Sequence, residues 1–535
     1  MASFDYVIIG GGSAGCIVAA ELSADPNNRV LLLEAGDPAE RNPEVLDADG
    51  YKDAFVNPNL LYERYSAPQA GCKGRSIFVG TGRGLGGSGS VNAMVYLRGS
   101  RADFDGWGVA GWGWDDVCPA FAAVEAVLDV HRRPPTDFTE TAIFAAEQVG
   151  FRRSEDLSDG DLHGVLGYEW MNYAGDRRRS SYVAFLAAHR QRPNLVVETG
   201  AKARRILFTA GEGAEPRASA VEFQVGDETV RTVSATREVI LCAGALESPR
   251  LLQLSGVGDA SALRELGIPV VCDLPGVGAG LRDHPNVTLF FRGRREIDCN
   301  YPQLYGFHRV GRGDDLAAEQ ADTCFVFYPA RSSLREAMIR MLPAMTLPPR
   351  LRDGAVAPAM LRGGVKAAFR SRRLRRFVAK VYGITVILGR PRSAGSVRLT
   401  SADPDAPARV DPAYFADPED LETMIRGVAL ARRIAAAEPL RRWGSRALMP
   451  GAGVRSDRRL ARFIRKNAMT TYHFASTCRM GTDAAAVVDP TLRVRGVAGL
   501  RVADASVMPE VPVSALNAPS MMIGWRAAQF IRDAG

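Results

Sequence analysis

Residues 5–35 read DYVIIGGGSAGCIVAAELSADPNNRVLLLEA, and this stretch decides the fold. Residues 6–9 are a short apolar, β-branched run that is typical of a fully buried parallel strand. The run breaks into a GxGxxG turn at 10–15, and a helix of small residues follows. Residues 30–33 predict a second buried strand, which places Glu34 at its carboxyl end. This order of elements predicts the first βαβ unit of an α/β domain with a parallel sheet.

Each glycine of the turn has its own task. Gly10 makes the tight turn, Gly12 lets the backbone approach a pyrophosphate, and Gly15 lets the helix pack closely on the strand. The helix N-terminus adds free N–H groups and a partial positive charge. Glu34 follows about 20 residues after the last glycine, where an acid accepts the ribose hydroxyls of a dinucleotide. Because an acid disfavours a 2′-phosphate at this place, the predicted ligand is NAD or FAD rather than NADP.

Length and composition are those of a large globular protein. A chain of 535 residues suggests two intimately connected domains, and 46% hydrophobic with 24% charged residues argues against disorder. The net charge of +7 is modest and no nucleic-acid motif accompanies it, so no nucleic acid partner is predicted. The eight cysteines and six histidines are scattered, so no metal site is predicted. The chain enters its first strand at once, no apolar run is long enough for a span, and the free thiols favour a cytoplasmic location.

A second glycine-rich segment, GRGLGGSGSVNAMV, lies at 82–95. Chains use such segments where the backbone must lie against a flat ligand with no side chain between them. Farther on, residues 248–255 predict a helix with Pro249 near its first position, and residues 521–533 predict the last helix.

The least legible region is 292–390. Within it, residues 360–382 predict a basic helix with apolar residues at roughly amphipathic spacing. Such a helix can contact an anionic membrane surface or a partner, but more often it is a solvated face of the protein. Both interpretations stay open from sequence.

Four long motifs, in the right order, resemble the glucose–methanol–choline (GMC) flavoprotein oxidoreductases. Besides the dinucleotide-binding start, GRGLGGSGSVNAMVYLRGSRADFD at 82–105 and GALESPRLLQLSGVG at 244–258 are similar to the family signatures. The C-terminal part carries TTYHFASTCRMG at 470–481 and GLRVADASVMPEVPVSALNAPSMMIGWRAA at 499–528. The amino-acid sequences of these motifs most resemble those of bacterial choline and alcohol dehydrogenases.

The resemblance implies an α/β fold with two parts. One is a Rossmann-type FAD-binding domain with discontinuous segments, and the other is an α+β substrate-binding domain built on an antiparallel sheet. We place the FAD-binding domain at 1–290, with some substrate-domain segments around 100–190. The substrate-binding domain then covers 291–465, and residues 466–535 return to the FAD domain.

The resemblance also implies bound FAD, held by segments from several parts of the chain. Its pyrophosphate would lie on the 10–15 loop, with Glu34 on the adenosine ribose and Ala203 near the adenine. Residues 92–95 would pass under the isoalloxazine, and residues 504–505 would meet the pyrophosphate–ribityl region. The predicted cofactor-binding residues are Gly10, Gly12, Ser13, Ala14, Gly15, Glu34, Ala35, Arg83, Gly87, Asn92, Ala93, Met94, Val95, Ala203, Tyr472, Asp504, Ala505, Ala518 and Pro519.

Two features of these motifs bear on how the flavin would be held. Some family members attach FAD covalently through a histidine just before the asparagine of the second loop, whereas this chain has Val91, so noncovalent FAD is expected. The last helix would point its N-terminus, at residues 517–519, toward the flavin C2 carbonyl. A helix dipole stabilises negative charge there, as the reduced flavin requires.

The resemblance assigns the catalytic role to His473 and Asn517. His473 would accept the proton of the substrate hydroxyl while the hydride passes to flavin N5, and Asn517 would donate a hydrogen bond to the developing alkoxide. An imidazole titrates near ~6.5, which suits proton transfer at neutral pH. Asn517 also suits the N-cap of the last helix, and His284 is expected to be structural.

The predicted reaction is oxidation of an alcohol to an aldehyde or ketone, with a small-molecule alcohol as substrate. The electron acceptor is either O2, as in an oxidase, or a quinone or other carrier. Three alternatives stay open: a hydroxynitrile-lyase-like enzyme without net redox, a flavin-binding protein without catalysis, and, least favoured, a fatty acid photodecarboxylase. The last has a cysteine where this chain has Gly389 and lacks the histidine found here at 473. The expected location is cytoplasmic, with peripheral contact of 360–382 with the inner membrane left open.

Overall fold

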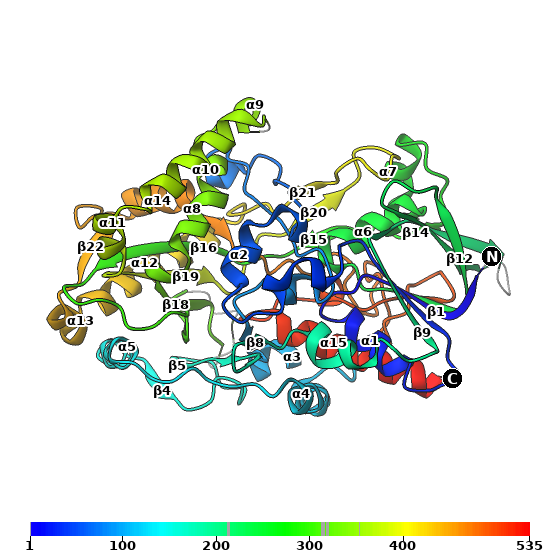
Figure 1. Ribbon diagram of the computed structural model, residues 1–535, viewed down its shortest axis with the longest axis horizontal. Helices are drawn as coiled ribbons and strands as arrows, with labels where there is room; N and C mark the ends of the chain where they lie inside the picture. Colours follow the sequence, from blue (N-terminus) through cyan, green and yellow to red (C-terminus); the bar gives the residue numbers. More distant parts are fainter. Residues whose placement is uncertain (1, 211–214, 312–315, 317–319, 353, 535) are drawn as a thin grey trace.

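Two sheets organise the chain (Figure 1). The computed structural model describes residues 2–210, 215–311, 316, 320–352 and 354–534. The first sheet has seven strands, ordered β10-β11-β12-β1-β2-β9 with β24 beside β12. Its strands are β1 (Ser3–Ile9), β2 (Val30–Glu34), β9 (Leu195–Thr199), β10 (Ala201–Ala210), β11 (Pro216–Val225), β12 (Arg231–Leu241) and β24 (Leu500–Val502).

The predicted βαβ unit is the centre of this sheet. Strand β1 pairs in parallel with both β2 and β12, and all four residues from Tyr6 to Ile9 are buried, as a central parallel strand requires. Helix α1 (Gly15–Leu22) joins β1 to β2 and packs on the last helix, α15 (Asn517–Ala534). Together with β24, α15 brings the end of the chain back onto its beginning.

The second sheet has eight strands and is mostly antiparallel, with the order β22-β16-β19-β18-β17-β5-β4 and β23 beside β16. Its strands are β4 (Arg152–Ser154), β5 (Val165–Tyr168), β16 (Pro285–Arg292), β17 (Leu304–His308), β18 (Thr323–Pro329), β19 (Val381–Leu388), β22 (Arg446–Met449) and β23 (Met469–Thr470). One face packs its apolar side chains against α5 (Asp137–Glu147) and α12 (Pro418–Ala436). The predicted α/β fold class, with a parallel-sheet domain and an antiparallel-sheet domain, is confirmed. The domain limits stay a prediction, and the limit at 290/291 lies within β16.

The helices differ from the sequence expectation in three places: the start of α15, the start of α6, and residues 360–382. The remaining principal helices are α2 (Tyr51–Val56), α4 (Trp114–Leu128), α6 (Gly244–Leu254), α8 (Ala330–Thr346), α9 (Pro349–Arg352), α10 (Val356–Ala368), α11 (Arg372–Val378), α13 (Glu438–Trp443) and α14 (Asp457–Asn467). Helix α15 begins at Asn517 rather than near residue 521, since Pro519 needs no N–H partner in the first turn. Among the described residues, no helix combines the length and the apolar character that crossing a bilayer would need.

Helix α6 begins four residues earlier than predicted because a distant acid caps it. Asp504 Oδ2 accepts hydrogen bonds from Gly244 N at 2.9 Å and from Ser248 Oγ at 2.5 Å. Pro249 therefore lies inside the helix, where its ring nitrogen leaves the carbonyl of Ala245 without the usual donor. The hydroxyl of Thr477 donates to that carbonyl at 2.7 Å and replaces the missing N–H.

The single helix predicted over 360–382 is wrong, because this stretch holds two helices and the start of a strand. Helix α10 ends at Ala368, and Ser371 caps α11 by accepting a hydrogen bond from Leu374 N. Val381 and Tyr382 belong to β19, where they pair with residues 291–292 of β16. Helices α8, α9, α10 and α11, at residues 330–378, form a projection at one side of the molecule that we call the arm (Figure 1).

Candidate active site

The first glycine turn is packed so closely that its backbone forms the surface of the site. Gly10 has a φ of 102°, which favours glycine, and a Cβ on Gly15 would lie 1.9 Å from the carbonyl oxygen of Gly10. A Cβ on Gly12 would meet its nearest neighbour, Cys242 O, at 3.9 Å, so this position is less crowded than Gly10 and Gly15. The tight turn expected of Gly10 and the close packing expected of Gly15 are present, and the contact of Gly12 with a pyrophosphate stays a prediction.

Glu34 ties the first glycine turn to the second. The carboxylate is buried at the end of β2 and accepts hydrogen bonds from Gly11 N at 2.8 Å, Gly36 N at 2.7 Å and Gly84 N at 2.9 Å. Arg83 reaches back to donate to the carbonyl of Ala35 at 3.1 Å. One oxygen of Glu34 accepts only a single bond, so it can also accept from a ribose hydroxyl.

The second glycine loop lies directly on the first. A Cβ on Gly87 would lie 2.8 Å from the Cα of Gly12. Asn92 Oδ1 accepts from the backbone of Met94, which has a left-handed φ of 66°, and thereby shapes the 92–95 turn that leads into β3 (Val95–Tyr96). Ala93 lies within this turn.

A buried arginine supports this loop from behind. Arg178 is fully buried and donates to Gly89 O at 3.1 Å, to Asn92 Oδ1 at 2.8 Å and to Asn92 O at 2.7 Å. Burial lowers its pKa to about 9, which leaves the guanidinium charged at neutral pH. Sequence reasoning missed Arg178, because three adjacent arginines at 177–179 give no signal for which one is buried.

The first residue of α15 completes the centre of the site. Ser13 Oγ donates to Asn517 Oδ1 at 2.9 Å, and a Cβ on Gly89 would lie 3.0 Å from that same oxygen. The buried Nδ2 of Asn517 has no hydrogen-bond partner among the described residues. Three segments far apart in sequence therefore converge here on one unsatisfied donor.

Ala14, Ala518 and Pro519 lie buried around this point, and a Cβ on Gly524 of α15 would lie 2.7 Å from the Cα of Ala14. Asp504 and Ala505 lie after β24, with the Asp504 carboxylate directed at α6 rather than at the glycine turn. Burial raises the pKa of Asp504.

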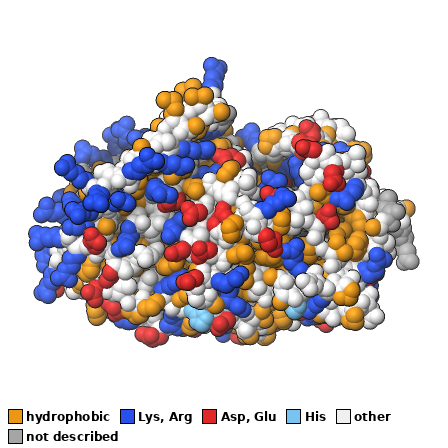
Figure 2. Space-filling view, viewed as in Figure 1, with side chains coloured by type: hydrophobic (Ala, Val, Ile, Leu, Met, Phe, Trp, Pro, Cys, Tyr) orange, Lys and Arg blue, Asp and Glu red, His pale blue; other side chains and the backbone are white. Residues whose placement is uncertain are grey.

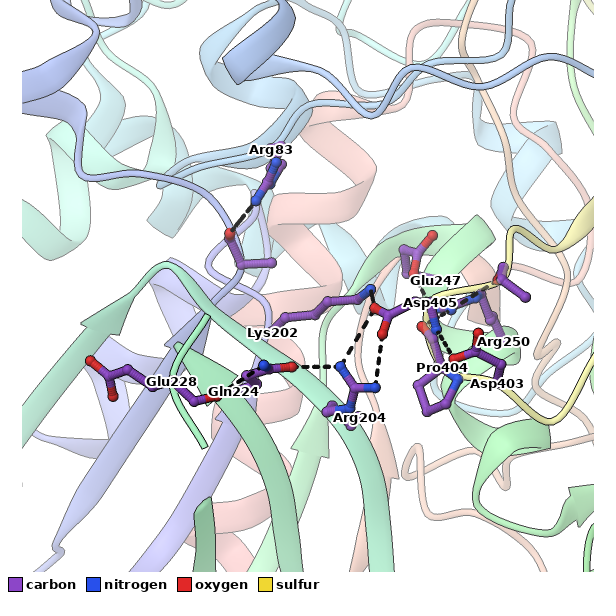
Figure 3. A network of polar contacts seen from close by, with 12 residues as sticks. Arg83, Lys202, Arg204, Gln224, Glu228, Glu247, Arg250, Asp403, Pro404 and Asp405 are labelled. Atoms are coloured by element: carbon purple, nitrogen blue, oxygen red, sulfur yellow. Dashed lines mark hydrogen bonds and ion pairs between the residues drawn. The ribbon is translucent and has the colours of Figure 1, made fainter. Parts of the chain in front are cut away.

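Ala203, which is predicted to lie near the adenine, is on β10 between two basic residues. Figure 3 shows Lys202 and Arg204 directed at Asp405, with N···O distances of 2.7 and 2.9 Å. Arg204 also donates to Gln224 on the neighbouring strand at 2.6 Å. Hydrogen bonds from both bases lower the pKa of Asp405 to about 2. These contacts fasten the loop around residue 405 onto the strand that carries Ala203.

His473 faces a second histidine. The Nδ1 atoms of His473 and His284 lie 2.9 Å apart, and the two rings are nearly perpendicular at 85°. Burial lowers the pKa of His473 to about 4 and that of His284 well below its usual range, so both rings are neutral at neutral pH. His284 therefore contacts the predicted catalytic histidine, and its expected structural role stays a prediction.

A buried acid holds the backbone of His473 in place. Asp283 accepts from His473 N at 2.7 Å, from Thr470 Oγ1 at 2.6 Å and from the hydroxyl of Tyr414. Burial raises the pKa of Asp283 to about 6. Thr470 Oγ1 also accepts from Tyr472 N at 2.7 Å, and this bond stabilises Tyr472 at a φ of 63°. Asp283 was missed from sequence, although its place beside His284 was the available signal.

An apolar cluster lies beside His473, on the side of Tyr472. Its members are Phe55, Leu61, Tyr65, Phe78, Val91, Met341, Met469 and Tyr472. The ring centroids of Phe55 and Phe78 lie 6.1 and 6.3 Å from that of Tyr472, in edge-on contact. This apolar cluster joins the second glycine loop, at Val91, to helix α8 of the arm.

The site as a whole has the donors and spaces that a dinucleotide flavin requires. The two glycine loops bring together their backbone, the Glu34 carboxylate with one oxygen that accepts a single bond, and the unsatisfied Nδ2 of Asn517. Among the described residues, no three His, Cys, Asp or Glu side chains gather as metal ligands would. The residues present fit FAD.

Comparison with known proteins agrees with this reading. The family described as GMC oxidoreductase matches twice, its N-terminal part at residues 4–286 and its C-terminal part at 391–524. An alcohol dehydrogenase [acceptor] from Pseudomonas putida is 35% identical over 561 residues, covering 99% of this chain and 95% of the relative. A chloroplastic fatty acid photodecarboxylase from Chlamydomonas reinhardtii is 35% identical over 569 residues, covering 99% and 90%.

Among solved structures, pyridoxine 4-oxidase from Mesorbium loti has a TM-score of 0.82 at 28% identity, with 99% of each chain covered. The family match covers most of the chain, and the relatives align over nearly its full length. The chain belongs to the GMC oxidoreductase family and is an FAD-dependent oxidoreductase.

Proposed function

We propose that this protein oxidises an alcohol to an aldehyde or ketone, with His473 as the proton acceptor. The observation that carries the proposal is the contact between His473 and His284 through their Nδ1 atoms, which leaves Nε2 of His473 for a substrate hydroxyl. FAD, when bound, supplies the acceptor for the hydride from the alcohol carbon.

One proton lies between the two Nδ1 atoms, and its place decides whether His473 can act as a base. When His473 carries it, His473 donates to His284 and its Nε2 keeps the lone pair that accepts a hydroxyl proton. Nε2 of His284 has no hydrogen-bond partner within the usual distance among the described residues, although the Gly389 backbone raises the pKa of the ring against the larger lowering by burial. A substrate O–H directed at Nε2 of His473 selects the competent tautomer, and His284 is thus a positioning residue.

Asn517 is proposed to act on the substrate oxygen. Its Oδ1 is fixed by Ser13, and its buried Nδ2 is a donor without a partner among the described residues. A fixed donor of this kind stabilises the negative charge that develops on the oxygen as the proton leaves.

FAD is proposed to bind noncovalently, since the second loop offers Val91 where a linking side chain would be needed. Residues 10–15 would hold the pyrophosphate and Glu34 the ribose. Ala203 would lie near the adenine, and residues 92–95 under the ring system. The electron acceptor is proposed to be O2 or a quinone or other carrier, and the protein is proposed to be cytoplasmic with peripheral membrane contact through 360–382.

The similarity to a photodecarboxylase calls for a separate argument, because one relative carries that name. His473 is present, and a Cβ on Gly389 would lie 2.6 Å from Val513 Cγ2 and 3.3 Å from Cys324 Sγ. A cysteine at 389 therefore does not fit without a shift of its neighbours. Both features favour alcohol oxidation over light-driven decarboxylation.

The test is an anaerobic titration of the purified holoenzyme with primary alcohols, followed by the visible flavin spectrum. One alcohol class is expected to bleach the flavin, and His473→Ala is expected to slow bleaching by about 10²–10⁴-fold. His131→Ala, a half-exposed histidine on the surface, serves as the matched control and should leave the rate unchanged. Bleaching that is equally fast in His473→Ala contradicts the assigned base, and a flavin that no alcohol bleaches favours the lyase or light-driven alternatives. Readmitting air then separates an oxidase, which recolours, from a dehydrogenase.

A further inference from the structure

The tip of the arm exposes large apolar side chains, which are rarely exposed on the rest of the described surface. Ten large hydrophobic residues are exposed among those described, and five of them lie between residues 345 and 377. Val356 and Met360 on α10 are 71% and 72% exposed, and Leu351 on α9 is 53% exposed. The remaining two of these five residues are Met345 and Phe377. Figure 2 shows apolar side chains gathered at this projecting tip.

Basic side chains lie directly behind the tip. From residue 344 to residue 382 the sequence has ten Lys and Arg but one acid, Asp353. Six of the basic side chains are exposed around α10 and α11: Lys366, Arg370, Arg372, Arg373, Arg375 and Arg376. None of these six forms an ion pair with any acid that the structure describes, so their charge is free to act on a partner.

We infer that the arm docks this protein on an anionic lipid bilayer, with the α9–α10 tip entering the interface. This inference deepens the peripheral contact proposed above and names the surface that makes it. Aliphatic side chains at a projecting end gain free energy from the acyl boundary, while the basic side chains behind them lie at the level of anionic headgroups. A second protein would need one surface that complements both the apolar tip and the basic side chains beside it.

The inner side of the arm connects the docking surface to the active site. Arg340 of α8 is buried and pairs with Glu63 at 2.6 Å, and Arg362 of α10 lies 3.7 Å from the same carboxylate. Arg352 of α9 stacks on the ring of Tyr65 at 4.1 Å. These contacts seat the arm on the apolar cluster that ends at Tyr472, next to His473. Docking would therefore bring an apolar alcohol dissolved in the bilayer close to that cluster.

The experiment is co-sedimentation of the holoenzyme with vesicles of phosphatidylcholine alone or mixed with phosphatidylglycerol, without substrate. Binding is expected only to the mixed vesicles and should weaken with added salt. The tip variant L351S/V356S/M360S and the charge variant R375Q/R376Q are each expected to lose about tenfold or more in partition coefficient. Matched controls are V196S/V230S, which removes two exposed valines elsewhere, and R29Q/R264Q, which removes the same charge elsewhere.

Flavin content and circular dichroism identical to wild type establish that the variants fold. Failure of the holoenzyme to bind mixed vesicles, or equal losses in variants and controls, would overturn the inference. A tip variant that changes the oligomeric state in sedimentation without changing vesicle binding would also overturn it, because the tip would then be a contact between copies. Since H473A holoenzyme should bind vesicles like wild type, the result does not depend on whether alcohol is oxidised.

Discussion

The two glycine loops, at residues 10–15 and 82–92, pack against each other through their backbones. In the arm, by contrast, the side chains that distinguish the surface point into solvent. The glycine loops approach so closely that a single Cβ on Gly15 would collide with Gly10. In the arm, a Cβ on Gly363 of α10 would meet nothing within 4 Å. The difference indicates that contacts between backbone segments fix the first region, whereas the side chains of the second have room to change.

The largest effect should come from filling the glycine contact. In Gly15→Ala the new methyl would lie 1.9 Å from the Gly10 carbonyl, and the turn must open to relieve the clash. We expect loss of bound flavin and a fall of about 3 kcal/mol in the free energy of unfolding. The matched change Gly363→Ala should raise that free energy by about 0.5–1 kcal/mol. Flavin absorbance per protein and urea unfolding measure both; a flavin-replete Gly15→Ala protein would refute the packing argument.

The next effect tests the positioning role of His284. His284→Ala removes the acceptor at Nδ1 and lets the His473 ring rotate, so kcat should fall about 10²-fold with little change in KM. His284→Asn places an amide oxygen near the former Nδ1 and should recover much of the loss. Steady-state kinetics with one alcohol separate kcat from KM. Equal activities of the alanine and asparagine variants would show that His284 only fills space.

The pH dependence of flavin reduction tests whether a buried His473 is the base. Protonated His473 cannot accept a proton, and burial lowers its pKa to about 4. The reduction rate should therefore stay level from neutral pH downward and decline only as the pH approaches about 4. Stopped-flow reduction across this range, with stability checked at each pH, gives the profile. A decline centred near ~6.5, the value of an exposed imidazole, would mean that water reaches the ring.

The smallest effect distinguishes the surface of the arm from the core. Met360→Ala on α10 should change the free energy of unfolding by less than about 0.5 kcal/mol, since the side chain is already exposed. Met521→Ala on α15, fully buried, should cost about 2–4 kcal/mol through the cavity it leaves. Urea unfolding compares the pair. A large cost for Met360→Ala would show that the arm packs its tip against the protein.

The regions that could be predicted from sequence are those in which residue type restricts the backbone conformation. The βαβ unit follows from buried β-branched runs and glycine spacing, and the structure has it in the predicted order. His473 was identified by resemblance, but its contact with His284 depends on tertiary pairing of β23 with β16, to which no local pattern points. The start of α6 was missed for the same reason, because Asp504 caps it from far along the chain. In the arm, local propensity suggested one helix, and a serine cap together with strand pairing at Val381 broke it.

The pairing of β24 with β12, and of α15 with α1, has a consequence for how the protein is made. Ser13 and Asn517 lie 504 residues apart in the chain, so the glycine turn emerges from the ribosome long before its partner on α15. Contacts between parts so distant in sequence form slowly. Until they form, β12 lacks its pairing with β24 in the central sheet. A nascent chain stalled before residue 500 would therefore lack both β24 and the Asn517 side chain to which Ser13 donates.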